Sequence, residues 1–309
     1  MSDLYTIKKE TMTNIADGLR ALIGSTEEFN AQEIGTRMVE LGESGDIGGN
    51  TDIEDGLVTR SLTSYENNRV INVGDSAFYR YNNLTSVNFP SVISIGADAF
   101  RECANLTSIT FPTATSIGSY AFCGCSNLTS VNFPTATSIG SYAFYRCNNL
   151  VSANFPIATS ITWGALHNCS KLTSIDFPVA TSIGSDAFCG CSSLTSVNLP
   201  AVMSIGNDAF YHCNNLISVS FPAAITISSG AFKNCYNLRD VYLSGSTVCT
   251  LLNSTAFHST PFAGYSSYFS GTPYIYVPSS LLTSYKTATN WTYFSKYFSA
   301  ISDSGTNPA

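Results

Sequence analysis

The chain has 309 residues, enough for one large or two average domains, and carries 14 Lys and Arg residues against 21 Asp and Glu residues. This modest acidity provides no basic surface for phosphate binding, which argues against nucleic acid as a partner. Only 11% of the residues are charged, so we expect a surface made mainly of Ser, Thr, Asn and Tyr. No run of apolar residues is long enough for insertion into a membrane.

Residues 1–41 are predicted to form a small helical segment. Apolar residues recur there at helical spacing, and Asn30 followed by Glu33 is typical of a helix start. Residues 42–56 are rich in Gly and Asp, so we expect a flexible linker. The opening residues carry neither the apolar stretch nor the cleavage site of a secretion signal, so we expect cytoplasmic synthesis.

A period of 22 residues organises residues 57–245, which we expect to form a solenoid. An aromatic or large apolar residue after Ala marks each repeat, at Phe78, Phe100, Phe122, Phe144, Leu166, Phe188, Phe210 and Phe232. Rows of Leu, Val or Ile, a second Phe and a final Ile follow at the same interval. Such self-similarity is typical of an array in which each repeat completes the core of its neighbours.

Each repeat is predicted to contain two short strands. Residues 85–89 alternate apolar with small polar side chains, as a half-buried strand does, and Pro90 ends that strand. Residues 114–117 have the pattern of a second strand on the opposite side. After Gly118 we expect a short helical or 3₁₀ turn that directs Phe122 inward. Successive strands then stack in parallel about 4.8 Å apart.

Residues 246–309 are predicted to form an aromatic cap at the C-terminal end. The period lengthens to 25 at Phe257, and residues 274–278 have the pattern of a strand that leads into a helix. Aromatic residues are concentrated in 291–298. A cap is expected because an uncovered last coil would leave open sheet edges. The predicted fold is therefore an α+β solenoid with a helical N-terminal segment.

The repeat resembles the BspA-like, Treponema-type leucine-rich repeat. The motif Ala-Phe-x-x-Cys-x-x-Leu-Thr-Ser-Val-x-Phe-Pro-x-Ala-Thr-Ser-Ile-Gly recurs over about residues 70–245, with departures at Tyr81, Leu166 and Ser244. The resemblance implies a right-handed leucine-rich-repeat superhelix. It also implies a bacterial surface adhesin or other binding protein that has no catalytic residues.

The two ends of the chain are similar to tail-associated proteins in phages and prophages of gut Firmicutes, through residues 5–20 and 274–291. This similarity implies a virion protein of a tail fibre or baseplate, released by lysis after cytoplasmic synthesis. The N-terminal segment would bind other tail proteins, or form a homo-oligomer such as a trimer, and the solenoid would recognise a host surface protein or glycan. The alternative is a bacterial cell-surface adhesin that binds a host protein or glycan.

The cysteines are interpreted mainly as core residues. Seven of the ten occupy one repeat position, at Cys103, Cys125, Cys147, Cys169, Cys191, Cys213 and Cys235. Ligands in a line cannot converge on a tetrahedral zinc ion, although adjacent rungs are close enough for occasional disulfide bridging. Cys123 and Cys189 lie outside this row, and three coils separate them. We therefore predict no metal site and no cofactor.

Catalysis is not expected. The three histidines lie in different coils without a nucleophile beside them, and we interpret them as solvated surface residues. A glycan hydrolase would need paired carboxylates facing a groove. The coils carry only scattered ones, such as Asp98, Glu102, Asp176, Asp186 and Asp208.

Ligand binding is predicted where the repeats differ from one another, beside the Ala-Phe turn. Aromatic side chains with polar edges on a rigid scaffold provide contact area at little entropic cost. The candidate ligand-binding residues are Tyr120, Tyr142, Tyr145, Trp163, His167 and Tyr211. Trp163 is interpreted either as a platform for a sugar or a protein, or as a residue that fills the volume lost at Leu166.

Overall fold

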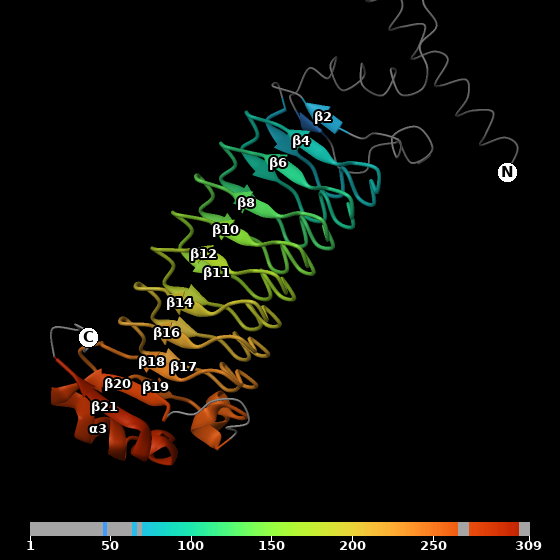
Figure 1. The fold of residues 1–309 in the computed structure, drawn as a ribbon. Helices are drawn as coiled ribbons and strands as arrows, with labels where there is room; N and C mark the ends of the chain where they lie inside the picture. Colours follow the sequence, from blue (N-terminus) through green and yellow to red (C-terminus); the bar gives the residue numbers. More distant parts are fainter. Residues whose placement is uncertain (1–45, 48–63, 67–69, 265–271, 303–309) are drawn as a thin grey trace, which may run out of the picture.

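The structure, a computed structural model, describes residues 46–47, 64–66, 70–264 and 272–302. These residues form a solenoid of about ten turns of stacked parallel strands, with a cap at the C-terminal end (Figure 1). The predicted fold class is confirmed. The N-terminal segment 1–41 lies outside the described residues, as does most of the predicted linker 42–56.

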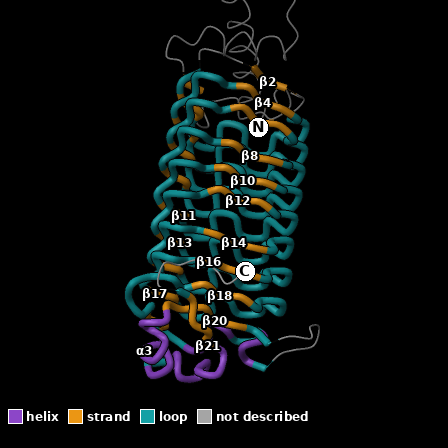
Figure 2. The backbone as a smooth tube through the Cα atoms, turned by 60° about the vertical axis from the view of Figure 1, so that its left-hand side comes forward, coloured by secondary structure: helices purple, strands orange, loops and turns teal. Residues whose placement is uncertain are grey.

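Three-residue strands form one face of the rod (Figure 2). They are β2 (Ser64–Glu66), β4 (Ser86–Asn88), β6 (Ser108–Thr110), β8 (Ser130–Asn132), β10 (Ser152–Asn154), β12 (Ser174–Asp176), β14 (Ser196–Asn198), β16 (Ser218–Ser220) and β18 (Asp240–Tyr242). Where these strands pair they are parallel, and each residue pairs with its equivalent one repeat on, such as Ser130 with Ser152. From β4 to β18, the middle side chain of each strand is more buried than, or as buried as, its neighbours and points toward the core.

Two-residue strands form the second face. They are β1 (Asp46–Ile47), β3 (Asn72–Val73), β5 (Ser94–Ile95), β7 (Ser116–Ile117), β9 (Ser138–Ile139), β11 (Ser160–Ile161), β13 (Ser182–Ile183), β15 (Ser204–Ile205), β17 (Thr226–Ile227) and β19 (Thr250–Leu251). β1 falls within the predicted linker and pairs in parallel with β3. Pairing thus reaches into that segment.

The core consists of ladders of identical side chains that run along the rod. The rings of Phe100 and Phe122 stack with centroids 5.2 Å apart and planes 5° from parallel, and Phe144 continues the stack. The seven cysteines of the predicted row are fully buried, as expected for core residues. Their thiols also have a polar role. The Cys125 Sγ donates to the carbonyl oxygen of Phe100 at 3.1 Å, and the other six make the equivalent bond.

The long corner joins each second-face strand to the next first-face strand, as residues 118–129 join β7 to β8. The helical or 3₁₀ turn predicted here is wrong, because the backbone has positive φ both two residues before and two residues after the inward Phe. A residue with positive φ cannot continue a right-handed helix. Gly118 begins the corner because a Cβ there would lie 2.4 Å from the carbonyl carbon of Gly96 in the preceding coil.

The cap covers the last coil with short helices and two further strands. It contains η1 (Ser254–Phe257), η2 (Pro261–Ala263), β20 (Tyr274–Pro278), η3 (Ser279–Leu281), α3 (Leu282–Thr287), η4 (Trp291–Tyr297) and β21 (Phe298–Ile301). The predicted strand 274–278 and the helix after it are present. Trp291 is fully buried, and its Nε1 donates to the carbonyl oxygen of Cys249 at 2.6 Å. This bond ties the cap to the end of the solenoid.

Candidate functional site

The candidate site lies on the long corners, where side chains are free of the core. Two rows of side chains differ from coil to coil there. Every residue of the first row has positive φ. The row contains Ser76, Asp98, Tyr120, Tyr142, Gly164, Asp186, Asp208 and Gly230. The second row follows the inward Phe or Leu directly, and contains Tyr79, Arg101, Cys123, Tyr145, His167, Cys189, Tyr211 and Lys233.

Tyr120 and Tyr142 adopt a backbone conformation that suits other residues better. Both have φ of 57°. A side chain with a Cβ in this left-handed region loses about 1–2 kcal/mol, and Gly, Asn or Asp tolerate it best. Other coils place Gly or Asp at the same position. Two bulky aromatic residues are therefore held there at a cost to the stability of the fold.

The rings of five candidate residues come together in what we call the aromatic corner, formed by Tyr120, Tyr142, Tyr145, Trp163 and His167. Ring centroids are 5.2 Å apart for Tyr120 and Tyr142, and 5.3 Å apart for Tyr142 and Trp163. His167 meets the Tyr145 ring edge to face at 5.2 Å. The cluster crosses three coils. The sequence-predicted residues other than Tyr211 thus form one continuous surface.

Trp163 projects from this surface. Its side chain is 53% exposed, which excludes the interpretation that it fills the volume lost at Leu166. Gly164, beside it, has φ of 60°, and a Cβ there would lie 2.3 Å from Cε1 of the Tyr142 ring. Gly164 therefore provides the space that the Tyr142 ring occupies. The unusual sequence of this coil accommodates the aromatic surface.

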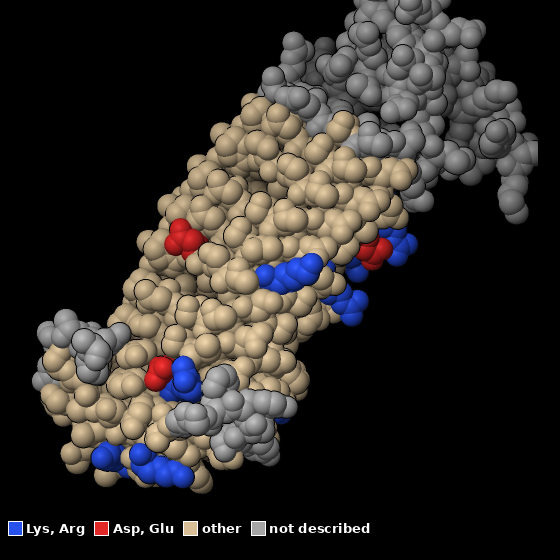
Figure 3. Space-filling model, in the orientation of Figure 1, with Lys and Arg blue, Asp and Glu red and all other residues tan. Residues whose placement is uncertain are grey.

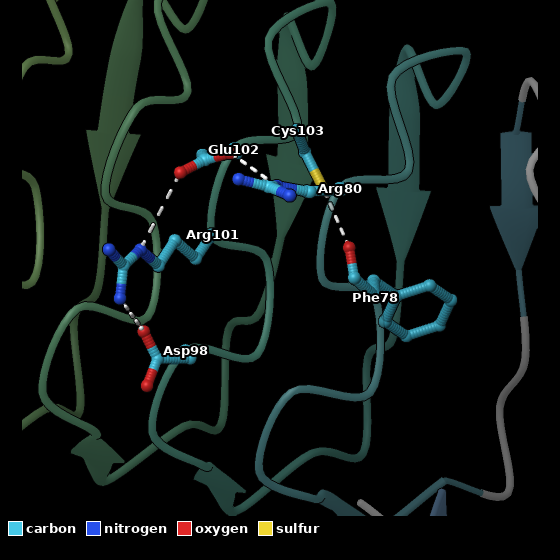
Figure 4. Close-up of polar contacts among 6 residues, drawn as sticks. All are labelled: Phe78, Arg80, Asp98, Arg101, Glu102 and Cys103. Atoms are coloured by element: carbon cyan, nitrogen blue, oxygen red, sulfur yellow. Dashed lines mark hydrogen bonds and ion pairs between the residues drawn. The ribbon is translucent and has the colours of Figure 1, made fainter. Parts of the chain in front are cut away.

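Arg101, which the sequence reasoning missed, extends the aromatic corner toward the N-terminal end of the rod. Its guanidinium carbon lies 5.4 Å from the centroid of the Tyr120 ring and 6.0 Å from that of Tyr79. Asp98 accepts a hydrogen bond of 2.9 Å from its Nη1, and Glu102 lies on its other side (Figure 4). These contacts hold the cation beside two rings. A guanidinium in this position adds charge to a surface that is otherwise aromatic.

Tyr211, the sixth candidate residue, lies apart from the aromatic corner. Its ring contacts His212, with centroids 4.1 Å apart, and the Lys233 ammonium lies 5.5 Å from its centroid. It belongs to a smaller group two coils further along the rod. Tyr211 is therefore left out of the binding surface defined by the other five.

His167 also faces the next coil, where it meets Asp186 and Cys189. One ligand-type atom of each residue lies within 4.8 Å of the other two. The Nδ1 atom of His167 is buried and has no hydrogen-bond partner within the described part of the chain, an arrangement that costs about 1–3 kcal/mol for a buried polar atom. Burial lowers the pKa of His167 and, with Asp186 nearby, raises the pKa of Cys189 to about 12. This cluster was not expected from the sequence, which placed the histidines among solvated surface residues.

The described surface carries few charges. On the face shown in Figure 3, Lys, Arg, Asp and Glu side chains occur singly or in small groups that are separated by wide uncharged areas. No helix in the described ranges is long and apolar enough to cross a membrane. The groups that this face offers to a partner are therefore mainly aromatic, hydroxyl and amide groups.

Comparison with known proteins identifies the repeat. The family profile described as BspA type Leucine rich repeat region (6 copies) matches residues 60–173 and 159–266. A leucine rich cell surface protein from Faecalibacterium prausnitzii A2-165 has 24% identity and a TM-score of 0.52, with 62% of this chain and 66% of that chain covered. The chain thus spans just under two thirds of that protein, and the likeness shows a shared fold.

Two other solved structures are also similar. The T. pallidum Leucine Rich Repeat protein has 26% identity and a TM-score of 0.34, covering 71% of this chain and 77% of that one. A leucine-rich repeat protein from Eubacterium ventriosum has 17% identity and a TM-score of 0.31, covering 72% and 91%. The search of curated proteins found no match.

Proposed function

This chain belongs to the BspA-type leucine-rich-repeat family, and on that basis we propose that it is a bacterial surface adhesin. In this proposal the aromatic corner binds a protein or glycan on a host cell or a neighbouring cell. A protein of the same fold from F. prausnitzii is a cell surface protein, which supports the surface location. Of the two hypotheses from the sequence, the proposal favours the cell-surface adhesin over the tail-associated virion protein.

The observation that carries the proposal is the positive φ of Tyr120 and Tyr142. A purely structural role at these positions would be filled at lower cost by Gly or Asp, which other coils use. Backbone strain that the fold does not need is typical of functional sites. The strain here holds the two rings in a stack, with planes 12° from parallel, beside the exposed Trp163, whose ring is tilted by 53° from that of Tyr142. We call these three rings the platform.

The chemistry of the platform suits a sugar or a protein loop. The apolar face of a pyranose ring, or an aromatic or aliphatic side chain, packs well on an exposed aromatic ring such as that of Trp163. The phenol groups of the tyrosines and the Arg101 guanidinium then donate hydrogen bonds at the edge. We propose binding without catalysis, because the carboxylates near the platform are engaged. Asp98 pairs with Arg101, and Asp186 accepts a hydrogen bond from Trp163.

The tail-associated function is the second candidate. Of its two sequence segments, residues 5–20 lie outside the described residues, and residues 274–291 form part of the cap. Attachment to tail proteins through residues 1–41, trimerisation and a virion location all remain predictions. In both functions the solenoid would contact a cell surface.

A binding screen tests the proposed site. The purified chain is applied to glycan arrays, to immobilised surface proteins and to intact bacterial and epithelial cells. Trp163→Ala and Tyr142→Asn should each weaken binding at least about 10-fold, as loss of a central aromatic contact does. Tyr236→Ala removes an exposed tyrosine of another coil and should leave binding unchanged. Equal binding by all four proteins would rule out the aromatic corner.

A second experiment separates the two locations. Protease treatment of intact cells should remove the protein if it is displayed on the cell surface. Immunogold labelling of particles released after prophage induction should then find no label on tails. The opposite pair of results would support the tail-associated function and overturn the surface location.

A further inference from the structure

His167, Asp186 and Cys189 come from the long corners of two adjacent coils. His167 and Cys189 occupy the same repeat position one coil apart. Backbone hydrogen bonds from Leu166 to Ala187, at 2.9 Å, and from Asn168 to Cys189, at 2.7 Å, hold the two corners together on both sides of His167. The ring of His167 is thereby fixed at the level of the two other side chains.

The three side chains provide one nitrogen, one oxygen and one sulfur atom within 4.8 Å of one another. Metal–ligand bonds to such atoms are about 2.0–2.3 Å long, so small side-chain rotations bring all three to a common ion. The Nε1 of Trp163 donates to Oδ2 of Asp186 at 3.2 Å. A hydrogen bond of this kind orients a ligating carboxylate.

We propose that His167, Asp186 and Cys189 form a binding site for a divalent transition metal ion, with Zn²⁺ as the natural occupant. The partnerless Nδ1 of His167 is a second observation that points to a ligand, because this buried nitrogen has no partner among the described residues. Imidazole and thiolate ligands select zinc over calcium and magnesium, which prefer oxygen alone. Three protein ligands leave a fourth position open to water or to an oxygen atom of a ligand.

The repeat contains a matched control for this site. Three coils earlier, the same three positions hold Arg101, Tyr120 and Cys123. Cys123 is buried like Cys189, and its corner has the same backbone. It has no imidazole or carboxylate in the equivalent places. A metal that simply bound buried thiols would not distinguish the two cysteines.

The experiment uses the full chain without a histidine tag, reduced and freed of metal. Co²⁺ is titrated first, because a cobalt–thiolate bond gives a charge-transfer absorption band that carboxylates and imidazoles do not give. One equivalent of Co²⁺ should produce the band. Added Zn²⁺ should displace the Co²⁺ and abolish the band. Co²⁺ should also quench the emission of Trp163, with the emission of buried Trp291 largely retained. Absence of the band in the unmodified chain would overturn the proposal.

Variants assign the ligands. Cys189→Ser should abolish the band, and His167→Gln should weaken Zn²⁺ binding by more than about 100-fold, because loss of a direct ligand exceeds the effect of an outer hydrogen bond. Cys123→Ser and His212→Gln should bind as the unmodified chain does. Thermal unfolding of each variant without metal verifies the fold. Retention of the band in Cys189→Ser, or its loss in Cys123→Ser, would overturn the assignment. His167 belongs to both proposed sites, but the cobalt band reports metal binding alone and the binding screen reports adhesion alone, so either proposal can fail without the other.

Discussion

Two corners of the rod have the same backbone and different chemistry. At the corner of Cys123, the two variable rows supply Arg101 and Tyr120, which extend the aromatic surface. At the corner of Cys189, they supply His167 and Asp186, which cluster with the thiol. The inward Phe and the buried cysteine beneath are the same in both. The chemistry of the corners therefore varies through side chains that the core does not constrain.

The largest expected effect is a transfer of metal binding between the two corners. The double variant Arg101→His, Tyr120→Asp reproduces the cluster around Cys123. Asp is suited to the positive φ at position 120, because Asp98 and Asp208 adopt the same conformation. The chain should then bind a second equivalent of Co²⁺, measured by the thiolate band. Arg101→His alone is the control and should bind one equivalent. No second equivalent in the double variant would mean that the corners differ in more than these positions.

Removal of the shared core residue should destabilise both corners. Phe122→Ala and Phe188→Ala should each lower the free energy of unfolding by about 3–5 kcal/mol. Phe122 stacks on rings in both adjacent coils, whereas Phe188 faces Leu166 on one side and stacks only on Phe210. Loss of Phe122 should therefore cost about 0.5–1.5 kcal/mol more. Urea unfolding measures the difference, and the reverse order would contradict this account of the stack.

Placing a tyrosine alone at positive φ isolates the backbone strain. Asp208→Tyr should lower the stability by about 1–2 kcal/mol, because Asp208 has φ of 52° and the new ring would have no tyrosine in the same row of the adjacent coils to stack on. Asp208→Asn keeps a residue suited to this conformation and should be nearly neutral. Urea midpoints of the two variants provide the comparison. Equal stability would show that Tyr120 and Tyr142 are not strained, which removes the main support for the binding site.

The smallest effect is expected at the glycine beneath the Tyr142 ring. Gly164→Ala and Gly124→Ala should each cost about 1 kcal/mol through their positive φ. Only Gly164→Ala should also displace the Tyr142 ring, since a Cβ at Gly124 has its nearest neighbour at 3.5 Å. The emission of Trp163 should therefore change in the first variant alone. The same spectrum in both would argue against the close contact between Gly164 and Tyr142.

The core could be predicted from the sequence because each of its positions repeats the same kind of residue. Phe122, Leu128 and Ile139 have equivalents every 22 residues, and burial allows little variation there. The corner backbone is mispredicted because Ser, Asp, Tyr and Gly all occur at its first positive-φ position, so no single residue type marks it. Some coils have Gly at one of the two positive-φ positions, such as Gly164 at the first and Gly124 at the second. These glycines are the signal in the sequence that indicates positive φ.

The surface clusters were predicted less completely. The aromatic corner was found because its members depart from the consensus in neighbouring coils. The cluster of His167, Asp186 and Cys189 was missed because each residue was considered within its own coil. The signal was present in the spacing, since His167 and Cys189 are one period apart and therefore adjacent in the rod.

The constant register of the solenoid also determines which insertions and deletions in the gene preserve the fold. Most coils are joined through partners 21 to 23 residues apart, as in the pairing of Ser182 with Ser204. A loss or duplication of 66 nucleotides in the gene removes or adds one 22-residue repeat. The remaining coils then still find all of their hydrogen-bonding partners in the adjacent coils. Each such event between His167 and Tyr211 moves Tyr211 and Lys233 relative to His167 by one strand spacing, about 4.8 Å. The distance between surface groups can therefore change in fixed steps from one generation to the next, with the core unchanged.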